Sequence, residues 1–462
     1  MNILNYKLYY FLGVGGIGMS ALARFFKHYK KEVIGYDKTV TTLTNQIQEE
    51  GIFCHFDENI NSLESILTNY SKEDVLVVYT PAIPKEHTEY QFLVRNNYTI
   101  LKRSVVLGEI SKQFKTIAIA GTHGKTTTTT LVTHLLKSAG INCFSFMGGI
   151  SKNYNTNLLL GDINDSSAYM VVEADEYDRS FLTLQPQIAV ITSVDADHLD
   201  IYGNADQVKE GYALFAKQVK EGGILIVKKN VNNDLKQLNK PIIYSLNLDT
   251  EYCAESITVE NAQFSYNIKS PVEAINNVTL GLPGLHNIEN SIAAVAIAQQ
   301  IGIKSDVIKS ALRSFSGVKR RFDYRVKTEN LIYIDDYAHH PEELKATITS
   351  VKKLYPAKKI TGIFQPHLFS RTRDFIDDFA TNLDLLDECI LLEIYPAREK
   401  PIEGVNATWL LSKMKLKNKR LMTKQQVLDE IKNEVPEVLI TMGAGDIDSL
   451  IEPLEILLKT KI

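Results

Sequence analysis

The stretch Thr116–Thr127 reads Thr-Ile-Ala-Ile-Ala-Gly-Thr-His-Gly-Lys-Thr-Thr. Its apolar first half, Thr116–Ala120, predicts a buried strand, and Lys125–Ala139 has the pattern of a helix. A Gly-Lys-Thr triplet between a strand and a helix is typical of a phosphate-binding loop. The loop departs from the standard spacing because Ile119 stands where the first glycine is usual.

Each residue type in this loop suits one part of a nucleoside triphosphate. Glycine lets the backbone approach phosphate, a lysine can hold the β- and γ-phosphates, and a threonine hydroxyl can bind Mg²⁺. We assign these last two roles to Lys125 and Thr126; a surface turn is the alternative. The residues predicted to bind ATP here are Gly121, Thr122, His123, Gly124, Lys125, Thr126 and Thr127. The threonines at 127–130 are expected mainly to pack and cap the helix.

A second glycine loop, Gly13-Val14-Gly15-Gly16-Ile17-Gly18, lies between the predicted strand 7–12 and a helix at 19–28. Asp37 ends the next predicted strand, where dinucleotide-binding folds place an acid that binds ribose. Glycines and a helix N-terminus together favour a diphosphate. The substrate-binding residues predicted here are Gly13, Gly15, Gly16, Ile17, Gly18 and Asp37. NAD, FAD and a UDP-sugar all carry this group, and a tight turn without ligand is the alternative.

The presence of both loops is more informative than either loop alone. An NAD enzyme has no need of the second loop, and a plain ATPase has no need of the first. We therefore predict one nucleotide carried on the substrate and ATP as the energy source.

Acidic residues follow two predicted strands downstream of the ATP loop. Glu173 ends the apolar run at 170–173, and His198 lies in Asp195-Ala196-Asp197-His198-Leu199-Asp200 after the run at 188–193. Ligands of α/β proteins bind at such strand ends. We predict that Thr126, Glu173 and His198 hold magnesium; solvated acidic loops are the alternative.

Alternating strand-like and helical patterns along all 462 residues predict an α/β protein with mainly parallel sheets. We place boundaries near residues 110 and 317. The prediction is a Rossmann-like domain at 1–109, a central domain of the P-loop ATPase type with a parallel or mixed sheet at 110–316, and a Rossmann-like domain at 317–462.

Composition excludes several classes of protein. The formal net charge of −4 argues against nucleic acid or an anionic membrane as the main partner. No apolar run is long enough for a membrane-spanning helix, and we see no signal peptide. The four cysteines have no metal or disulfide spacing, which favours a reducing cytoplasm.

The motifs together resemble those of the Mur ligase superfamily, ATP-dependent enzymes that form amide bonds in peptidoglycan synthesis. The ATP loop, Glu-Ala-Asp-Glu at 173–176 and Asp-His-Leu-Asp at 197–200 match its central domain in order. Leu-His-Asn-Ile-Glu-Asn at 285–290 also matches, which implies adenine contacts from Asn287 and Asn290. The resemblance further implies that Arg321 binds ATP phosphates and Asp336 the ribose. The implied catalytic residues are Lys125, Glu173, His198 and Arg321.

Within the superfamily, the chain is similar to the alanine-adding members. Gly-Gly-Ile-Gly-Met-Ser at 15–20, Phe-Gln-Pro-His at 364–367 and Thr-Met-Gly-Ala-Gly-Asp-Ile at 441–447 carry this likeness. It implies UDP-N-acetylmuramate and L-alanine as substrates, ATP and Mg²⁺ as cofactors, and a monomer or weak homodimer. His339, His367 and Arg371 are the implied ligands of muramate and of the alanine carboxylate.

Two departures qualify the likeness. Some members have arginine after the histidine at 367, whereas this chain has Leu368. Members that add later amino acids carry a modified lysine about 14 residues after the metal histidine. Tyr212 stands there, as the alanine-adding type requires.

Three alternatives differ in chemistry. A murein-tripeptide recycling ligase of the same superfamily would share the ATP residues and differ in its amino-acid pocket. The first glycine loop alone would also support an NAD-dependent oxidoreductase. A nucleotide-sensing regulator without catalysis is the third.

Overall fold

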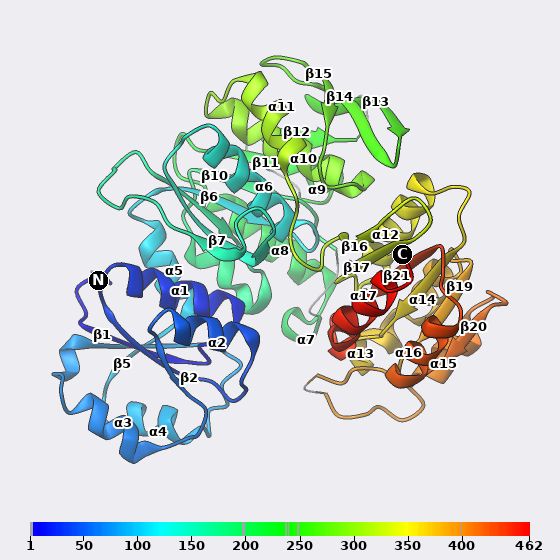
Figure 1. Ribbon diagram of the computed structural model, residues 1–462. Helices are drawn as coiled ribbons and strands as arrows, with labels where there is room; N and C mark the ends of the chain where they lie inside the picture. The colour runs from blue at the N-terminus through cyan, green and yellow to red at the C-terminus, as the bar shows by residue number, and fades with distance from the viewer. Residues whose placement is uncertain (1–2, 196–198, 236–237, 239, 247–248, 398) are drawn as a thin grey trace. The chain divides into compact units, whose positions relative to one another are not determined.

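The computed structural model describes residues 3–195, 199–235, 238, 240–246, 249–397 and 399–462. Three β-sheets flanked by helices confirm the predicted α/β class (Figure 1). The chain forms two compact units. The first comprises 1–253, 269–274 and 290–311, and the second 254–268, 275–289 and 312–462. Within the described residues, no helix has both the length and the apolarity to cross a membrane.

The first sheet is wholly parallel and has the order β3-β2-β1-β4-β5. Its strands are β1 (Leu8–Leu12), β2 (Glu32–Tyr36), β3 (Phe53–His55), β4 (Val75–Tyr79) and β5 (Thr99–Lys102). Its helices are α1 (Ile17–His28), α2 (Thr42–Glu49), α3 (Ile60–Leu67), η1 (Lys72–Asp74), α4 (Thr88–Arg95) and α5 (Arg103–Ser111). Strand order reverses between β1 and β4, and the first glycine loop leaves β1 at this switch point, where ligands bind in such folds.

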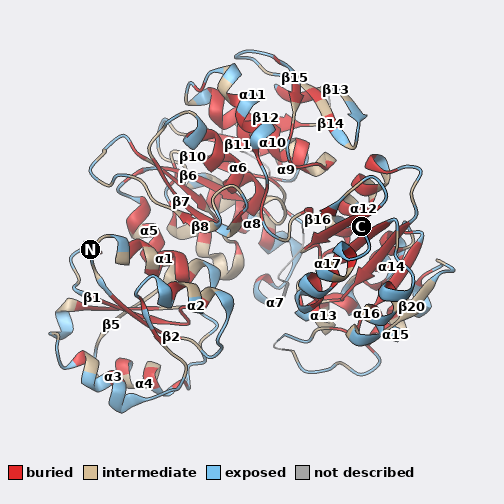
Figure 2. Ribbon diagram, viewed as in Figure 1, coloured by how far each residue is buried: buried red, intermediate tan, exposed pale blue. Residues whose placement is uncertain are grey.

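Strand β1, Leu-Tyr-Tyr-Phe-Leu, is buried on both faces of this sheet. Tyr9 and Phe11 belong to the core under α1, while Leu8, Tyr10 and Leu12 face α3 and α4. A parallel sheet covered by helices on both faces requires such an uninterrupted apolar run. The buried strands stand out between exposed helix surfaces in Figure 2.

The second sheet lies mainly in the first unit, where its strand order is β12-β11-β10-β6-β9-β7-β8. These strands are β6 (Lys115–Ala120), β7 (Cys143–Ser151), β8 (Thr156–Leu159), β9 (Tyr169–Glu173), β10 (Ile188–Ile191), β11 (Ile224–Lys228) and β12 (Ile242–Ser245). All pair in parallel except β8, which is antiparallel to β7. The accompanying helices are α6 (Lys125–Ser138), η2 (Tyr177–Thr183), α7 (Leu199–Tyr202), α8 (Ala205–Lys217) and α9 (Lys229–Asp234).

Two elements run from one unit into the other. Strand β13 (Tyr252–Glu260) begins beside β12 and continues into the second unit, where β14 (Gln263–Lys269) pairs antiparallel with β15 (Ile275–Thr279). Helix α10 (Leu285–Gln300) begins in the second unit and continues into the first, and α11 (Ser305–Ser314) follows it.

The third sheet has the order β16-β17-β21-β18-β19-β20, with β16 antiparallel to its neighbour. Its strands are β16 (Asp323–Lys327), β17 (Ile332–Asp336), β18 (Ile360–Phe364), β19 (Glu388–Leu391), β20 (Lys419–Leu421) and β21 (Val438–Met442). Its helices are α12 (Pro341–Leu354), α13 (Phe369–Asp374), α14 (Ile376–Leu383), α15 (Ala407–Lys413), α16 (Lys424–Asn433), η3 (Asp446–Leu450) and α17 (Ile451–Lys459).

Helix α1 joins the first two sheets. The Phe25 ring on α1 lies 6.1 Å from Phe144 and 5.6 Å from Phe146, both on β7. The fully buried Asn157 on β8 donates to the Ile17 carbonyl at 2.6 Å and accepts from Arg24 at 2.7 Å. One continuous core therefore underlies both sheets. The domain boundaries near 110 and 317 stay predictions.

Asn157→Ala is expected to destabilise the first unit by about 1–3 kcal/mol, because the Ile17 carbonyl and Arg24 lose a buried hydrogen-bond partner. Urea unfolding followed by far-UV circular dichroism measures this change. Exposed Asn164 is the matched control, and Asn164→Ala should stay within about 0.5 kcal/mol of the parent. Equal costs for the two variants would contradict the role given to Asn157.

Candidate functional site

The first glycine loop is tied to the neighbouring strands. Gly13 and Val14 donate their N–H groups to the Tyr36 carbonyl at 2.8 and 2.9 Å. Gly13 has φ +88°, and a Cβ there would lie 2.7 Å from the Thr80 methyl group. Gly16 is the N-cap of α1 and is exposed. The loop therefore presents a helix N-terminus at the switch point, as the sequence predicts.

Asp37 lies beside this loop and supports it. One carboxylate oxygen accepts from the Gly15 N–H at 2.7 Å and the other from the Thr39 N–H at 3.2 Å. A Cβ on Gly15 would approach the Asp37 oxygen to 2.8 Å, so a side chain there would displace Asp37 from the loop. The structure thus shows a supporting role for Asp37, and its contact with ribose stays a prediction.

The second loop leaves β6 and ends at Gly124, the N-cap of α6. Gly121 and Gly124 have φ +133° and +83°, in the left-handed region that favours glycine. A Cβ on Gly124 would lie 2.6 Å from the Asn290 side-chain oxygen. The structure therefore brings Asn290, predicted as an adenine ligand, directly against the predicted phosphate loop.

Lys125 points back over its own loop. Its Nζ donates to the carbonyls of Gly121 at 2.5 Å and Thr122 at 3.2 Å, and to Glu176 Oε1 at 2.8 Å. Burial lowers the pKa of Lys125, but attraction to Glu176, Glu173 and Asp175 outweighs it and raises the pKa overall. The ammonium group is therefore charged and surrounded by acceptors, as a phosphate ligand must be.

Glu176 is the partner of Lys125 that the sequence did not single out. Its side chain is 5% exposed, and Oε2 has no hydrogen bond within the described residues. Glu176 stands in the acidic motif at 173–176 together with Glu173 and Asp175. This motif was the only sequence signal for the role of Glu176. The spacing of residues within a loop does not reveal which of the three carboxylates pairs with Lys125.

Thr126 and Glu173, both predicted to hold magnesium, are in contact, and their metal binding stays a prediction. The Thr126 hydroxyl donates to Glu173 Oε1 at 3.1 Å, and Gly148 N–H donates to Glu173 Oε2 at 3.0 Å. A hydroxyl and a carboxylate are oxygen ligands of the kind Mg²⁺ prefers, alongside water and phosphate oxygens. The third predicted ligand, His198, lies outside the described residues, within which no group of three or more His, Cys, Asp or Glu side chains forms a metal cluster.

The other loop residues contact the strand end after β10. His123 Nε2 lies 3.5 Å from Asp195 Oδ2, and its N–H donates to the Ser193 hydroxyl at 2.8 Å. The Thr122 hydroxyl donates to the Asp195 carbonyl at 3.1 Å and lies 3.5 Å from the Tyr212 hydroxyl. Tyr212 is fully buried.

The threonines at 127–130 pack inside the first unit. Thr128, Thr129 and Thr130 are fully buried, and the Thr130 hydroxyl donates to the Thr126 carbonyl at 2.8 Å. The expectation of helix packing is confirmed. The expectation of capping is wrong, because Gly124 occupies the N-cap position of α6.

In the second unit, Arg320 and Arg321 flank Tyr337. Their guanidinium carbons lie 5.2 and 5.1 Å from its ring centroid. Arg320 also donates to Asp335 at 3.2 Å and to the Gly443 carbonyl at 2.8 Å, whereas Arg321 lies 3.4 Å from Glu343. Arg320 is therefore tied to the sheet. The phosphate contact of Arg321 stays a prediction.

Asp336 ends β17 and is 5% exposed. Its carboxylate accepts from the N–H groups of Phe322 at 3.2 Å and Ala338 at 3.0 Å, and from the Thr347 hydroxyl at 2.9 Å. Burial raises its pKa to about 6. These bonds organise the strand end, and the ribose contact stays a prediction.

Two of the predicted substrate ligands in the second unit lie close together. The His339 and His367 rings have centroids 6.0 Å apart, and His367 stacks on Tyr395 at 5.8 Å. Arg371 is 7% exposed, and its charge acts on His339. Burial lowers the pKa of His339 to about 4, so its ring is neutral at physiological pH. Arg371 and these histidines can together receive an anionic group.

The neighbouring residues have structural roles. His340 is the N-cap of α12, where Nδ1 accepts from the Glu342 N–H at 3.4 Å. Arg373 is exposed and pairs with Asp374 at 2.7 Å. The second predicted adenine ligand, Asn287, is buried on α10 and donates to the Pro283 carbonyl at 2.6 Å; its adenine contact stays a prediction.

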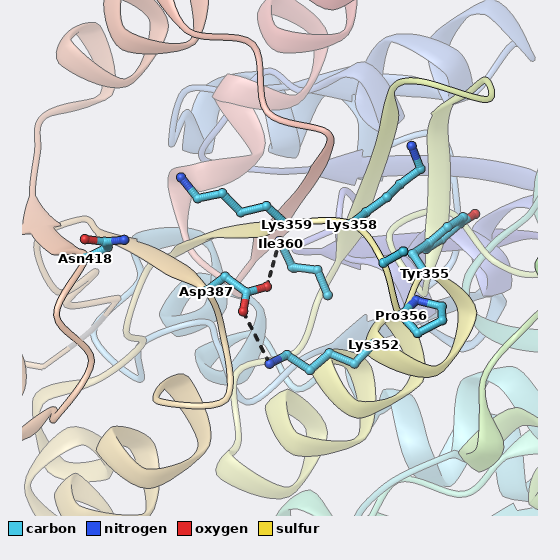
Figure 3. Close-up of a pocket in the computed structure, with 9 residues that line it drawn as sticks. Lys352, Tyr355, Pro356, Lys358, Lys359, Ile360, Asp387 and Asn418 are labelled. Atoms are coloured by element: carbon cyan, nitrogen blue, oxygen red, sulfur yellow. Dashed lines mark hydrogen bonds and ion pairs between the residues drawn. The ribbon is translucent and has the colours of Figure 1, made fainter.

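A cavity of about 490 Å³ lies at the amino end of β18, whereas His367 follows the carboxyl end of that strand. Figure 3 shows the residues that line the cavity. Asp387 Oδ1 lies 3.7 Å from Lys352, and the other oxygen accepts from the Ile360 N–H at 2.9 Å. No predicted site residue lines it. The lining residues are Lys352, Tyr355, Pro356, Ala357, Lys358, Lys359, Ile360, Asp387 and Asn418.

Comparison with known proteins identifies the family of this chain. The family descriptions that match are Mur ligase family, catalytic domain (residues 8–115), Mur ligase middle domain (119–298) and Mur ligase, glutamate ligase domain (320–446). A UDP-N-acetylmuramate–L-alanine ligase of Flavobacterium johnsoniae is 44% identical over 462 residues, all of both chains. The chain belongs to the Mur ligase family. Another relative of that name, from Parabacteroides distasonis, is 46% identical over 99% of both chains.

Solved structures of Mur ligases share the fold. The UDP-N-acetylmuramate–alanine ligase of Thermotoga maritima aligns with a TM-score of 0.81 and 24% identity over 98% of this chain and 99% of that one. A murein peptide ligase from Psychrobacter arcticus aligns with a TM-score of 0.71 and 22% identity over 98% of both chains. The three sheets described above are thus those of a Mur ligase.

A double-mutant cycle tests the buried pair at the Mur ligase phosphate loop. Lys125→Met and Glu176→Gln should each cost about 3–5 kcal/mol of unfolding free energy, because each leaves one buried charge without its partner. The double variant should cost clearly less than the sum. Urea unfolding gives all four values.

The exposed pair Lys112–Glu109, 2.5 Å apart, serves as the control, and its coupling should be about 0–1 kcal/mol. Strictly additive costs at Lys125 and Glu176 would show that the two charges do not stabilise one another.

Proposed function

We propose that this chain joins L-alanine to the lactyl carboxylate of UDP-N-acetylmuramate with ATP, giving UDP-N-acetylmuramoyl-L-alanine, ADP and phosphate. The observation that carries the proposal is the 44–46% identity, over essentially the whole chain, to curated relatives named UDP-N-acetylmuramate–L-alanine ligase. The same identity to ligases leaves the NAD-dependent oxidoreductase alternative without support.

The first half of the reaction transfers the γ-phosphoryl group to the carboxylate. Lys125 is proposed to leave Glu176 and bind the β- and γ-phosphates, while Asn290 meets the nucleotide beside Gly124. Thr126, Glu173 and His198 would hold Mg²⁺, which neutralises charge on the phosphoryl group. The protein thus supplies position and electrostatic stabilisation.

The second half forms the amide bond. The alanine amine attacks the acyl phosphate carbonyl, a tetrahedral intermediate collapses, phosphate leaves and the amine loses a proton. His339, His367 and Arg371 are proposed to hold the muramate and the alanine carboxylate, since a guanidinium can bind both carboxylate oxygens. Exclusion of water would protect the acyl phosphate from hydrolysis.

Phosphate release with UDP-N-acetylmuramate and ATP tests the proposal directly. L-alanine should give the highest kcat/KM of an amino-acid panel. Glycine should be poorer by about tenfold or more, because one methyl group in a pocket discriminates by about 1–3 kcal/mol. Faster turnover with the tripeptide L-Ala-γ-D-Glu-diaminopimelate would assign the chain to the recycling reaction instead.

Gly124→Ala should abolish ATP binding measured by calorimetry, because the new methyl group meets the Asn290 oxygen and deforms the loop. Gly140→Ala is the matched control, since Gly140 also has positive φ, +70°, but has open space around it. Both variants carry similar backbone strain, about 1–2 kcal/mol. Equal ATP affinity in the two variants would contradict the proposed loop function.

A further inference from the structure

Glu343, in the first turn of α12, contacts two of the predicted ligands at once. Its Oε1 accepts from Arg321 Nη1 at 3.4 Å. Its Oε2 accepts from the His339 N–H at 3.0 Å and lies 3.3 Å from His339 Nδ1. Arg321 is predicted to bind the ATP phosphates, and His339 a substrate. One carboxylate of the second unit therefore links a candidate ATP ligand to a candidate substrate ligand.

The start of α12 fixes the position of Glu343. The residue belongs to a capping box, in which Oε2 also accepts from the N–H of the N-cap residue His340 at 3.3 Å. Such reciprocal bonds order the first turn of a helix. The Glu343 side chain is 14% exposed, so its carboxylate is mostly withdrawn from water. With Oε2 held by backbone N–H groups, Oε1 is the oxygen that meets Arg321.

Arg321 is held from two directions. Glu343 contacts one end of the guanidinium, and the guanidinium carbon lies 5.1 Å from the Tyr337 ring centroid. The flanking residues Arg320 and Phe322 adopt positive φ, 62° and 47°, although neither is glycine. Backbone strain of this kind persists only where surrounding contacts hold it, and it concentrates at functional sites. The Arg321 side chain is 29% exposed, so its guanidinium is accessible to a phosphate.

The contacts of His339 determine which of its ring nitrogens carries the proton. Nδ1 lies 2.9 Å from the Tyr337 carbonyl oxygen and 3.3 Å from Glu343 Oε2. Both oxygens are acceptors, so Nδ1 is the donor. The ring is neutral, because burial lowers the pKa of His339 to about 4. Nε2 is therefore the acceptor nitrogen, and it suits an N–H group such as the amine of an amino acid.

We propose that Glu343 is a positioning residue of the ligation reaction. Its Oε1 orients the Arg321 guanidinium toward the transferring phosphoryl group. Its Oε2 places the His339 ring so that Nε2 accepts a hydrogen bond from the alanine amine, which leaves Arg371 for the alanine carboxylate. This role rests on the proposed function and goes beyond it, because one carboxylate then serves both half-reactions.

Steady-state kinetics of Glu343→Gln test the contact with Arg321. The amide oxygen can still accept from the His339 and His340 N–H groups, but an NH₂ group then faces the guanidinium, and two donors cannot pair. We expect kcat to fall about tenfold to hundredfold, because a displacement of about 1 Å can cost about hundredfold in rate. KM for L-alanine should stay close to that of the parent. Unchanged or raised kcat would overturn the contact's role.

Glu343→Ala tests the contact with His339. This variant loses both oxygens, so KM for L-alanine should rise about tenfold, the loss of one hydrogen bond to a charged group, in addition to the fall in kcat. The glutamine variant should recover the alanine KM and not kcat, a separation that general destabilisation of α12 would not produce. An alanine KM equal to the parent's in Glu343→Ala would overturn the placement of His339.

Glu342 provides the matched control, because it is exposed and carries the same charge in the same helical turn. Glu342→Gln and Glu342→Ala should keep the parent's kinetics; an equal loss of kcat in Glu342→Gln would overturn the assignment to Glu343. The parent itself tests the proposed function, which the absence of alanine-dependent phosphate release would refute. Alanine-dependent release by the parent, with parent-like kinetics in both Glu343 variants, would refute the positioning role alone.

Discussion

The buried ammonium group of Lys125 is the charge around which the first unit's candidate site is organised. Glu173, Asp175 and Glu176 stand within four consecutive positions, and their mutual repulsion would oppose folding without a cation among them. Lys125 supplies that cation from the start of α6, while the loop carbonyls complete its hydrogen bonds. The fold of this region and the candidate phosphate site therefore depend on the same interaction, the pairing of Lys125 with the acidic residues at 173–176.

This arrangement explains how the protein can be acidic overall and still serve anionic nucleotides. With a net charge of −4, attraction cannot come from the whole surface. The groups proposed to attract them are local: the backbone N–H groups at the starts of α1 and α6, and the ammonium group of Lys125, which is paired with Glu176.

Packing and catalysis place different demands on the chain's glycines. Gly121 and Gly124 allow left-handed turns and close approach at the ATP loop. Gly15 and Gly18 leave room for Asp37 and Arg103, respectively. In a sequence motif, all of these glycines look alike and are assumed to let the backbone approach phosphate. The structure distinguishes two roles: some glycines adopt the backbone conformation of the loop, and others leave space for a neighbouring side chain.

The sequence alone was sufficient for the α/β class, for the strand–turn–helix form of both glycine loops, and for placing Thr126 and Glu173 at one edge of a sheet, because strand–turn–helix patterns are local and parallel strands bring their carboxyl ends to one edge. It did not predict Glu176 as the partner of Lys125, nor Arg103 at Gly18. Those contacts join residues 51 and 85 positions apart, and no motif specifies which residues pair. Only the packing of α1, α5 and the acidic loop in one core decides which charges meet.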